Sequence, residues 1–445
     1  MKAKLVGAAL AVLLLTAGTA LGAQEQPADV TAGAWWRAKL LGAAGEVPAG
    51  ASGPAAAPVA VIESGGFDAI HPDIPPTVTL RRAALSPFDA SHGTAVVSVI
   101  AGRGPRVLGL NPGSDVRVYQ HSGLCPDAAA AIRQAVRDGA KVITMSYGFG
   151  GPGLCLAHEV ATSYAAAFAV VVASAGNERA QPWLQPANDL HVLTVAALNA
   201  FDQPTGFTHQ SVSTDVAAPG EAIGVACPAA ADTDDGAADG FCSWSGTSFS
   251  APMVAAIAAR VVAARPDLSP PQVQRLLQES ATDIGKPGYD ISTGYGRVDL
   301  TRALTAPAPA IDWLEPNDDI EWVDGRHFRP DRPLIRTNRL LRFGASLDLL
   351  KDPVDTYAVW VGPGERMRAT VLAGGAGIRV AIHQPFARTV FAPRDRITAR
   401  ILVRPGRSVT VWAVNPFAKG RKVWVSLSIA RGKQLYTEYG ITLRR

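Results

Sequence analysis

Cysteine is scarce in this sequence, and its few cysteines lack the spacing of a metal site. Only 4 occur among 445 residues, and none forms a CxxC pair or has a histidine cluster nearby in the sequence. A zinc site is therefore not indicated. Charge is also sparse, because 18% of the residues are charged whereas 48% are hydrophobic. That balance excludes a disordered chain, and the length is sufficient for two domains or three.

Long apolar runs are missing after the N-terminal region. Residues 1–23 contain Lys2 and Lys4, an apolar run and small residues ending in ALGA, which is the layout of a secretory signal peptide. We expect cleavage near Gly22 or Ala23 and a secreted protein, periplasmic or extracellular. A membrane anchor is the alternative, but its strictly apolar part is short for a bilayer. No later segment is long and apolar enough to cross a membrane, so we expect no transmembrane anchor.

Export changes the interpretation of the four cysteines. In an oxidising compartment, an even number of cysteines predicts two disulfides. Three pairings are open, and we favour bonds between sequence neighbours, Cys125 with Cys155 and Cys227 with Cys242. Four free buried thiols are the alternative.

The sequence predicts two folded domains behind a short leader. Residues 24–57 are rich in Ala, Gly and Pro and are interpreted as a leader and linker. Over residues 58–305, apolar runs alternate with stretches of helical length, which predicts an α/β domain with a parallel sheet and helices on both faces. Over residues 306–445 the hydrophobic period falls to two, which predicts a smaller all-β sandwich domain.

The net charge differs in sign between these two domains. Residues 306–445 hold 23 Lys and Arg against 13 Asp and Glu, whereas the remainder holds 19 against 25. Opposite signs are expected for domains that attract each other, or for a C-terminal domain that contacts an anionic cell surface. Nucleic-acid binding is not expected, because the basic residues are spread along the segment without an aromatic stacking pattern.

Three segments carry residues suited to nucleophilic catalysis. The run VAVIESGGFDAIHPDI ends a buried strand in one acid, Glu63. SHGTAVVSVIAG places His92, and GTSFSAPMVAA places Ser248, each at the start of an apolar helix. A serine hydroxyl needs a base to take its proton, and histidine titrates near the working pH. A buried carboxylate can hold that histidine in one tautomer and stabilise its charged form.

Acylation of a serine also requires hydrogen-bond donors for the oxyanion. VVVASAGNE places Asn177 directly after a buried strand, where its side-chain amide can donate to that oxygen. The backbone N–H of Ser248 is the second expected donor. Each residue also has a purely structural interpretation, as a helix cap for His92 and Ser248 and as a turn residue for Asn177.

Four motifs occur in order along residues 58–303: HGT at 92–94, SAGN at 174–177, DVAAPG at 215–220 and GTSFSAP at 246–252. Together they resemble the catalytic domain of the subtilases, the subtilisin-like serine peptidases. The resemblance implies a subtilisin-like fold, a polypeptide substrate, and proteolysis with His92 as base, Ser248 as nucleophile and Asn177 in the oxyanion hole.

The resemblance also implies a segment that pairs with the substrate backbone as an added strand. This segment consists of Ser146, Tyr147 and Gly148. We further expect a pocket for the side chain before the scissile bond, with a floor of small residues that leaves room for a large apolar side chain. The expected floor residues are Ala173, Ser174, Ala175 and Gly176.

Glu63 departs from the family pattern, which has Asp at this place and a turn to HPD that is shorter by one residue. We expect Glu63 to act as the triad acid, because an acid ending an apolar strand is costly unless something pairs with it. Two alternatives stay open. Asp68 or Asp73 reaches His92 instead, or the site is degraded and the protein is a non-catalytic relative.

Other departures concern the surroundings of the site. Met253 stands where the family often has His and is interpreted as core packing. The leader is shorter than the family's folding pro-domain. EPNDD at 315–319 and DPVDTYAVWV at 352–361 are similar to β-sandwich appendages of secreted bacterial peptidases.

Two other functions compete with an exported endopeptidase. An esterase is disfavoured, because Ser248 lies in Gly-Thr-Ser-Phe-Ser and not in the lipase pattern GxSxG. A degraded subtilase-like protein could instead bind a partner through its basic C-terminal domain. We expect no cofactor. Calcium is common in the family, but no clear ligand cluster is visible in the sequence.

Overall fold

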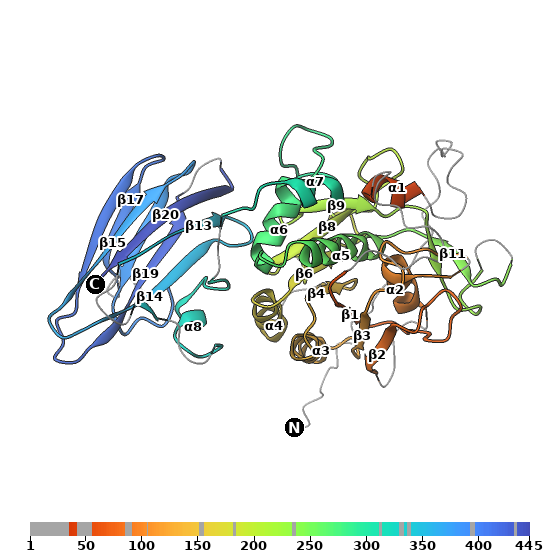
Figure 1. Ribbon diagram of the computed structural model, residues 1–445, viewed down its shortest axis with the longest axis horizontal. Coiled ribbons are helices and arrows are strands. Elements are labelled where there is room, and N and C mark those ends of the chain that lie inside the picture. The colour runs from red at the N-terminus through yellow and green to blue at the C-terminus, as the bar shows by residue number, and fades with distance from the viewer. Residues whose placement is uncertain are drawn as a thin grey trace, which may run out of the picture.

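The computed structural model describes residues 35–41, 56–84, 91–104, 106–150, 155–180, 184–233, 237–310, 314–328, 333–335, 340–391, 397–430 and 434–445. The predicted signal peptide and most of the predicted leader lie outside these residues. Figure 1 shows two bodies side by side, a helix-covered sheet and a body of β-strands. The all-β body is formed by the C-terminal part of the chain.

The first body is built on a seven-stranded parallel sheet with the strand order β2-β3-β1-β4-β6-β8-β9. Its strands are β1 (Val59–Glu63), β2 (Val78–Arg82), β3 (Val116–Gln120), β4 (Val142–Met145), β6 (Val170–Ser174), β8 (Val192–Leu198) and β9 (Val216–Pro219). A parallel sheet was predicted from the continuous apolar runs, and this prediction is confirmed.

Both faces of the central part of this sheet are buried, which explains why β4, β6 and β8 are apolar at nearly every position. The edge strand β2, by contrast, has exposed residues. In β1, Val59 and Val61 belong to one hydrophobic core, whereas Ala60 and Ile62 belong to a second core on the opposite face. Successive side chains of a strand point to opposite faces, so each face needs its own apolar residues.

Helices cover the two faces in two groups (Figure 1). On one face lie α2 (His92–Ala101), α5 (Thr247–Ala264), α6 (Pro270–Glu279) and α7 (Leu300–Thr305). On the other face lie α3 (Cys125–Arg137) and α4 (Leu156–Ala166). The short helix α1 (Trp35–Leu41) also packs on the first core, where Trp36, Leu40 and Leu41 are buried. These residues lie within the predicted leader and linker, and they pack on the core of this body.

The central helix α5 corrects one expectation from the sequence. Among the described residues, it is long and apolar enough to span a bilayer by length and composition, although no such segment was expected. In the structure, 78% of this 18-residue window is buried. Helix α5 packs against β4, β6, β8 and β9, so its apolar surface contacts the sheet.

The strand order brings distant segments to one edge of the sheet. Strand β1 lies between β3 and β4, so the chain continues to one side of β1 and then returns to the other. In open α/β sheets, ligands bind beyond the carboxyl ends of the strands at such a switch point. Glu63 ends β1, and Ser146 follows β4, at this edge.

Two small sheets and two disulfides complete this body. Strand β5 (Phe149–Gly150) pairs with β7 (Leu184–Gln185), and β10 (Ile223–Ala226) pairs with β11 (Phe241–Trp244). Cys125 is bonded to Cys155, with 6.3 Å between their Cα atoms, and Cys227 is bonded to Cys242, with 6.0 Å. The structure therefore contains the two disulfides between sequence neighbours that we favoured.

The C-terminal body is a sandwich of two sheets, as predicted from the period of two. One sheet has the order β12-β14-β19-β16-β17 and the other β13-β20-β15-β18. The strands are β12 (Pro333–Ile335), β13 (Leu340–Asp348), β14 (Val354–Val361), β15 (Arg366–Ala373), β16 (Ile378–His383), β17 (Ile397–Val403), β18 (Ser408–Val414), β19 (Arg421–Ile429) and β20 (Tyr436–Arg444). Their inward-facing residues form a third core, and the short helix α8 (Ile320–Val323) packs on the outside of β14.

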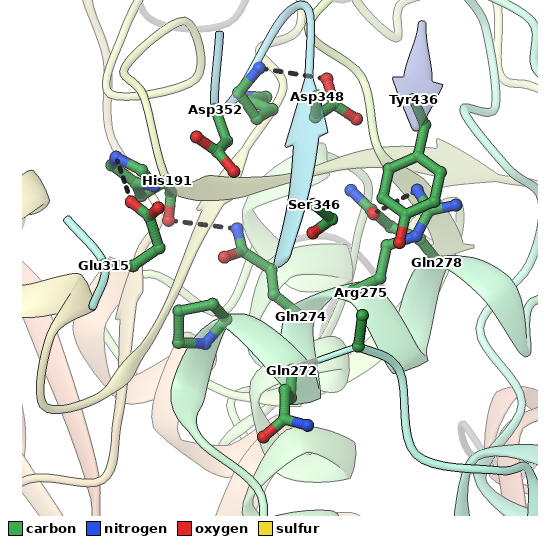
Figure 2. Close-up of a pocket in the computed structure, with 13 residues that line it drawn as sticks. His191, Gln272, Gln274, Arg275, Gln278, Glu315, Ser346, Asp348, Asp352 and Tyr436 are labelled. Carbon is green, nitrogen blue, oxygen red and sulfur yellow. Dashed lines mark hydrogen bonds and ion pairs between the residues drawn. The ribbon is translucent and has the colours of Figure 1, made fainter. Parts of the chain in front are cut away.

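Aromatic and ionic contacts join the two bodies. Phe328 stacks on Tyr164 of α4 with ring centroids 5.5 Å apart, and the Arg275 guanidinium lies 3.4 Å from the Tyr436 ring centroid. His191 forms an ion pair with Asp318 at 2.6 Å. Figure 2 shows the cleft at this joint, with His191 facing Glu315 across it. The bodies therefore meet through specific contacts.

Carboxyl groups gather on the sandwich side of this joint. Glu315, Asp352 and Asp355 each place one oxygen within 4.8 Å of the others. Burial raises the pKa of Asp355 to about 7, although a hydrogen bond with Glu315 and one with Tyr439 act in the opposite direction. Asp352 and Asp355 lie close together in one segment at the start of β14, whereas Glu315 comes from another, so the sequence alone did not place the three acids together.

Candidate active site

Glu63 lies at the centre of the site and contacts the predicted base directly. The His92 Nδ1–H donates to Glu63 Oε2 at 3.0 Å, and the Gly65 N–H donates to Oε1 at 2.8 Å. The carboxylate is buried, with 1% of its side-chain surface exposed, whereas His92 is 23% exposed. Both carboxylate oxygens thus accept a hydrogen bond, and the Nδ1 side of the imidazole faces the carboxylate.

Burial by itself would raise the pKa of Glu63, but its partners outweigh this effect. The charge and hydrogen bond of His92, together with the Gly65 N–H, lower the pKa of Glu63 below its ordinary value. Glu63 is therefore ionised at neutral pH. A Cβ placed on Gly93 would lie 2.6 Å from the Gly66 carbonyl oxygen and 3.0 Å from Glu63 Cγ, so the second residue of HGT has no room for a side chain.

The two alternative acids make other contacts. The Asp68 N–H donates to Thr94 Oγ1 at 2.8 Å, and the Asp68 carboxylate accepts from the Ile70 N–H at 3.0 Å. Asp73 is buried and accepts from the Arg106 N–H at 3.2 Å. These contacts order the loop after β1.

Ser248 and His92 begin neighbouring helices, α5 and α2, which pack against each other. The His92 ring lies 6.3 Å from the ring of Phe249, the residue after the predicted nucleophile. Ser248 Oγ–H donates to the Ser146 carbonyl at 3.5 Å, and Ser146 Oγ–H donates to the Ser248 carbonyl at 2.8 Å. The start of α5 is thereby attached to the residue that follows β4.

Asn177 is oriented by the turn that precedes Ser248. Its Oδ1 accepts from both the N–H and the hydroxyl of Thr247, each at 2.9 Å. The side-chain Nδ2 lies 3.3 Å from the position that a Cβ on Gly246 would take, and the Ser248 N–H lies 3.7 Å from that point. The two expected oxyanion donors therefore border the same position beside Gly246.

Leu184 lies beside the segments predicted to line the specificity pocket. A Cβ on Gly148 would lie 2.6 Å from Leu184 Cδ1, and one on Gly176 would lie 2.5 Å from Cδ2. The Leu184 side chain therefore lies between the two segments predicted to line the pocket. Ala173 is a fully buried core residue of β6. The sequence predicted room for a large apolar side chain at this place, and Leu184, from β7, lies there against Gly148 and Gly176.

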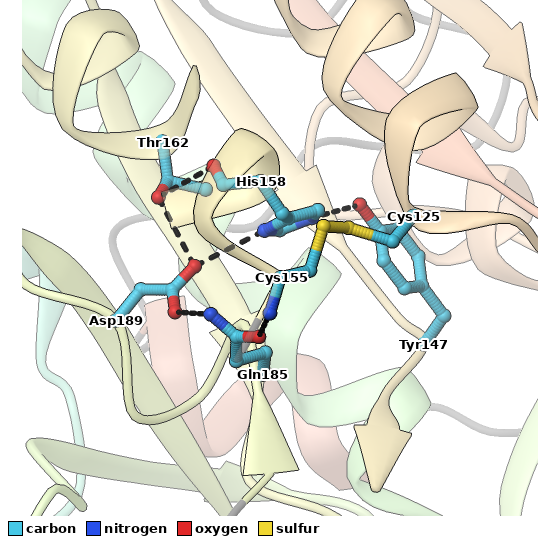
Figure 3. The surroundings of a disulfide bond; sticks show 7 residues. All are labelled: Cys125, Tyr147, Cys155, His158, Thr162, Gln185 and Asp189. Atoms are coloured by element: carbon cyan, nitrogen blue, oxygen red, sulfur yellow. Dashed lines mark hydrogen bonds and ion pairs between the residues drawn. A yellow bond between two sulfur atoms is a disulfide. The ribbon is translucent and has the colours of Figure 1, made fainter. Parts of the chain in front are cut away.

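A chain of hydrogen bonds that sequence reasoning missed starts at Tyr147 (Figure 3). Tyr147 OH donates to His158 Nε2 at 2.9 Å, and His158 Nδ1–H donates to Asp189 at 3.1 Å. Asp189 also accepts from Gln185 Nε2 at 2.7 Å, and Gln185 Oε1 accepts from the Cys155 N–H. The Tyr147 side chain thus points into the protein, which leaves the backbone of its segment for a substrate.

His121 was also missed, and it lies between the triad and this chain. Its ring contacts the Tyr147 ring at a centroid distance of 4.5 Å, and its N–H donates to the Glu63 carbonyl. Burial lowers the pKa of His121 to about 4, although the charge of Glu63 favours the protonated form. His121 is therefore neutral at neutral pH. Its only sequence signal is its position after an apolar strand.

Comparison with known proteins identifies the class to which this fold and site belong. Residues 56–296 match the Subtilase family, which is more than half of the chain. A subtilisin of Bacillus pumilus is 30% identical over 250 residues, which covers 52% of this chain and 86% of that protein. The chain belongs to the subtilase family.

Longer relatives match over part of their length. Fervidolysin of Fervidobacterium pennivorans is 32% identical over 297 residues, which covers 58% of this chain and 42% of that protein. A "Probable subtilase-type serine protease" of Deinococcus radiodurans is 35% identical over 232 residues, which covers 47% of this chain and 31% of that protein. The chain therefore spans less than half the length of these relatives.

Solved structures show the same fold. A lanthipeptide protease has a TM-score of 0.50 at 24% identity and covers 62% of this chain and 95% of its own. The protease S41, described as psychrophilic, has a TM-score of 0.50 at 23% identity and covers 60% of this chain and 97% of its own. The subtilisin-like fold expected from the four motifs is thus confirmed.

Proposed function

We propose that this protein is a secreted serine endopeptidase with a Glu-His-Ser triad. The observation that carries the proposal is the 3.0 Å contact between His92 Nδ1 and the buried Glu63 carboxylate, at the start of a helix that packs on α5. A contact of this kind is needed for base catalysis, because it sets the histidine tautomer and stabilises the imidazolium. A degraded binding protein would not require it.

The proposed reaction begins with attack on a peptide carbonyl. Ser248 Oγ forms a bond to the carbonyl carbon while His92 Nε2 takes the hydroxyl proton. Asn177 Nδ2 and the Ser248 N–H donate to the resulting oxyanion. The C–N bond then breaks, and His92 returns the proton to the leaving amine. Water, deprotonated by His92, hydrolyses the acyl-enzyme and restores the Ser248 hydroxyl. These residues complete the reaction, so no cofactor is required.

The substrate is proposed to be an extended polypeptide. Ser146 and Gly148 offer backbone groups next to the nucleophile, and the Tyr147 side chain is held away from them by His158. Because Leu184 lies between Gly148 and Gly176, we propose that the residue before the scissile bond is small, such as Gly or Ala. Secretion follows from the predicted signal peptide, and contact of the basic C-terminal body with an anionic cell surface stays a prediction.

Labelling with a fluorophosphonate probe tests the proposed chemistry, because the probe reacts covalently with an activated serine. We expect the full-length protein to be labelled and to cleave peptides, and the Ser248→Ala variant to do neither. Circular dichroism of both proteins controls for folding. A correctly folded wild-type protein that takes up no label would contradict the proposal and favour a binding function.

A further inference from the structure

Lys351, on the loop between β13 and β14, reaches from the sandwich into the sheet body. Only 6% of this residue is exposed. Its Nζ donates to the Ala187 carbonyl at 3.0 Å and to Thr194 Oγ1 at 3.1 Å, and it lies 3.5 Å from Asp215 Oδ2. Lysine is rarely buried unless its charge is paired. Here every one of these partners belongs to the sheet body.

The segment 186–191 is held by the sandwich at two points. Lys351 Nζ binds the Ala187 carbonyl near its start, and the His191 N–H donates to the Lys351 carbonyl at 3.1 Å near its end. The His191 side chain is in turn paired with Asp318 at 2.6 Å. In Figure 2 the His191 carbonyl also accepts from Gln274 of α6. The segment is thus fixed between the two bodies.

The other side of the same segment supports the proposed substrate site. Leu184, which lies against Gly148 and Gly176, is two positions before the segment, and the Leu184 N–H donates to Asn188 Oδ1 within it at 2.7 Å. Asp189, within it, fixes His158 and through it Tyr147. A displacement of the segment would therefore move both the pocket wall and the substrate-pairing strand.

We propose that Lys351 is a positioning residue for substrate recognition, so that the C-terminal sandwich is a working part of the catalytic unit. This inference rests on the proposed function for its substrate site. Lys351 acts through Ala187 and the segment 186–191 on Leu184 and Tyr147. Lys351 lies outside the triad. Removing its side chain therefore changes substrate binding and selectivity more than it changes the reactivity of Ser248.

The test compares Lys351→Met with Tyr436→Ala in the full-length protein. Tyr436 belongs to the same joint but contacts Arg275 of α6 and not the segment 186–191, so it controls for weaker docking of the two bodies. We expect Lys351→Met to raise KM, and to reduce discrimination between Ala and Phe before the scissile bond, by roughly tenfold or more. Its rate of fluorophosphonate labelling should stay within about twofold of wild type, since the triad is untouched. Tyr436→Ala should change none of these quantities.

Lys351→Met leaves Asp215 buried without its cation, which can impair folding. The double variant Lys351→Met/Asp215→Asn removes both charges and should fold, yet it still lacks the Nζ bond to Ala187. We expect the same effects on KM and selectivity in this variant. Unchanged KM and selectivity in the folded double variant, or equal effects in Tyr436→Ala, would overturn the proposal.

Hydrogen exchange separates this inference from the proposed function. Amides of residues 187–191 should exchange several-fold faster in the double variant than in wild type or in Tyr436→Ala, because the segment opens locally. Unchanged exchange would overturn the coupling whether or not the protein is active. Absence of labelling in wild type, by contrast, would contradict the proposed peptidase function and leave a positive exchange result standing.

Discussion

Glu63 shows how a single residue can be longer than its family's usual acid and still contact the histidine. Its backbone ends β1, its Cγ lies beside Gly93, and its carboxylate accepts from His92 and Gly65. The Cγ of this longer acid lies beside Gly93, where no side chain is present. The geometry of the carboxylate oxygens, and not the length of the chain that carries them, determines whether the imidazole is held.

Replacing Glu63 by Gln should lower turnover by about 10⁴-fold while the fold is kept, because an amide no longer stabilises the imidazolium. Asp68→Asn is the matched control and should leave turnover unchanged. The measurement is kcat for peptide cleavage, with circular dichroism to check folding. Normal cleavage by Glu63→Gln together with an inactive Asp68→Asn would assign the acid to Asp68 instead.

Leu184 is the residue on which side-chain selectivity should depend. Leu184→Ala should increase kcat/KM for substrates with Phe or Leu before the scissile bond, relative to Ala, by about 10- to 200-fold, the range expected for filling a hydrophobic pocket. Leu304→Ala, on the outer surface of α7, is the control. The prediction fails if wild type already prefers Phe, or if the preference is the same in both variants.

At the level of elements, the turn from β11 into α5 positions three functional groups together. Thr247 orients Asn177, Ser248 lies in the first turn of the buried helix, and Gly246 leaves open the position next to the two proposed oxyanion donors. Helix α5 is covered by the sheet and by α2, so this turn is fixed by the core of the body. The positions of these groups in the site therefore depend on how α5 packs in the core.

Gly246→Ala tests this arrangement. A Cβ there would stand 3.3 Å from Asn177 Nδ2 and 3.7 Å from the Ser248 N–H, where the oxyanion is proposed to bind. We expect kcat to fall by about 10²- to 10³-fold, as for the loss of an oxyanion donor, without loss of the fold. Gly206→Ala serves as the control, because a Cβ at Gly206 meets nothing within 4 Å. Equal activity of the two variants would place the oxyanion elsewhere.

At the level of the whole molecule, the two bodies share a buried ionic contact. Burial raises the pKa of Asp215 to about 6, although Lys351 and the Thr194 N–H favour its ionised form. The folded protein therefore binds the Asp215 proton more tightly than the unfolded chain, in which the pKa is near 3.8. The protonated Asp215 carboxyl therefore contributes its full stabilisation at pH values below the pKa of the unfolded chain. This contribution is lost as the pH rises through about 6, the pKa in the folded protein.

We therefore expect the stability difference between wild type and Asp215→Asn to depend on pH. The free energy of unfolding of wild type, relative to this variant, should decrease by on the order of 3 kcal/mol between about pH 4 and pH 7. Urea unfolding with the disulfides intact measures this difference, and Asp267→Asn is an exposed control. A difference that is constant over this range would show that Asp215 does not titrate as described.

Much of the fold and of the site was accessible from local sequence patterns. The apolar runs predicted the parallel sheet because both of its faces are buried, and the period of two predicted the sandwich because each of its sheets has an inner and an outer face. The motifs around His92, Asn177 and Ser248 predicted chemistry because each places its functional group at a strand or helix end. Each of these patterns is local, because the residues that form it lie within a short stretch of the sequence.

Tertiary structure alone decided which acid contacts His92, what fills the pocket and how the two bodies meet. Glu63 contacts a residue 29 positions away, and Lys351 contacts one 164 positions away. Leu184 lies against Gly148 and Gly176 through strand pairing of β5 with β7. Such contacts depend on how segments that are distant in the sequence pack against each other. Periodicity shows which face of an element is buried, but it does not show which distant side chain that face will contact.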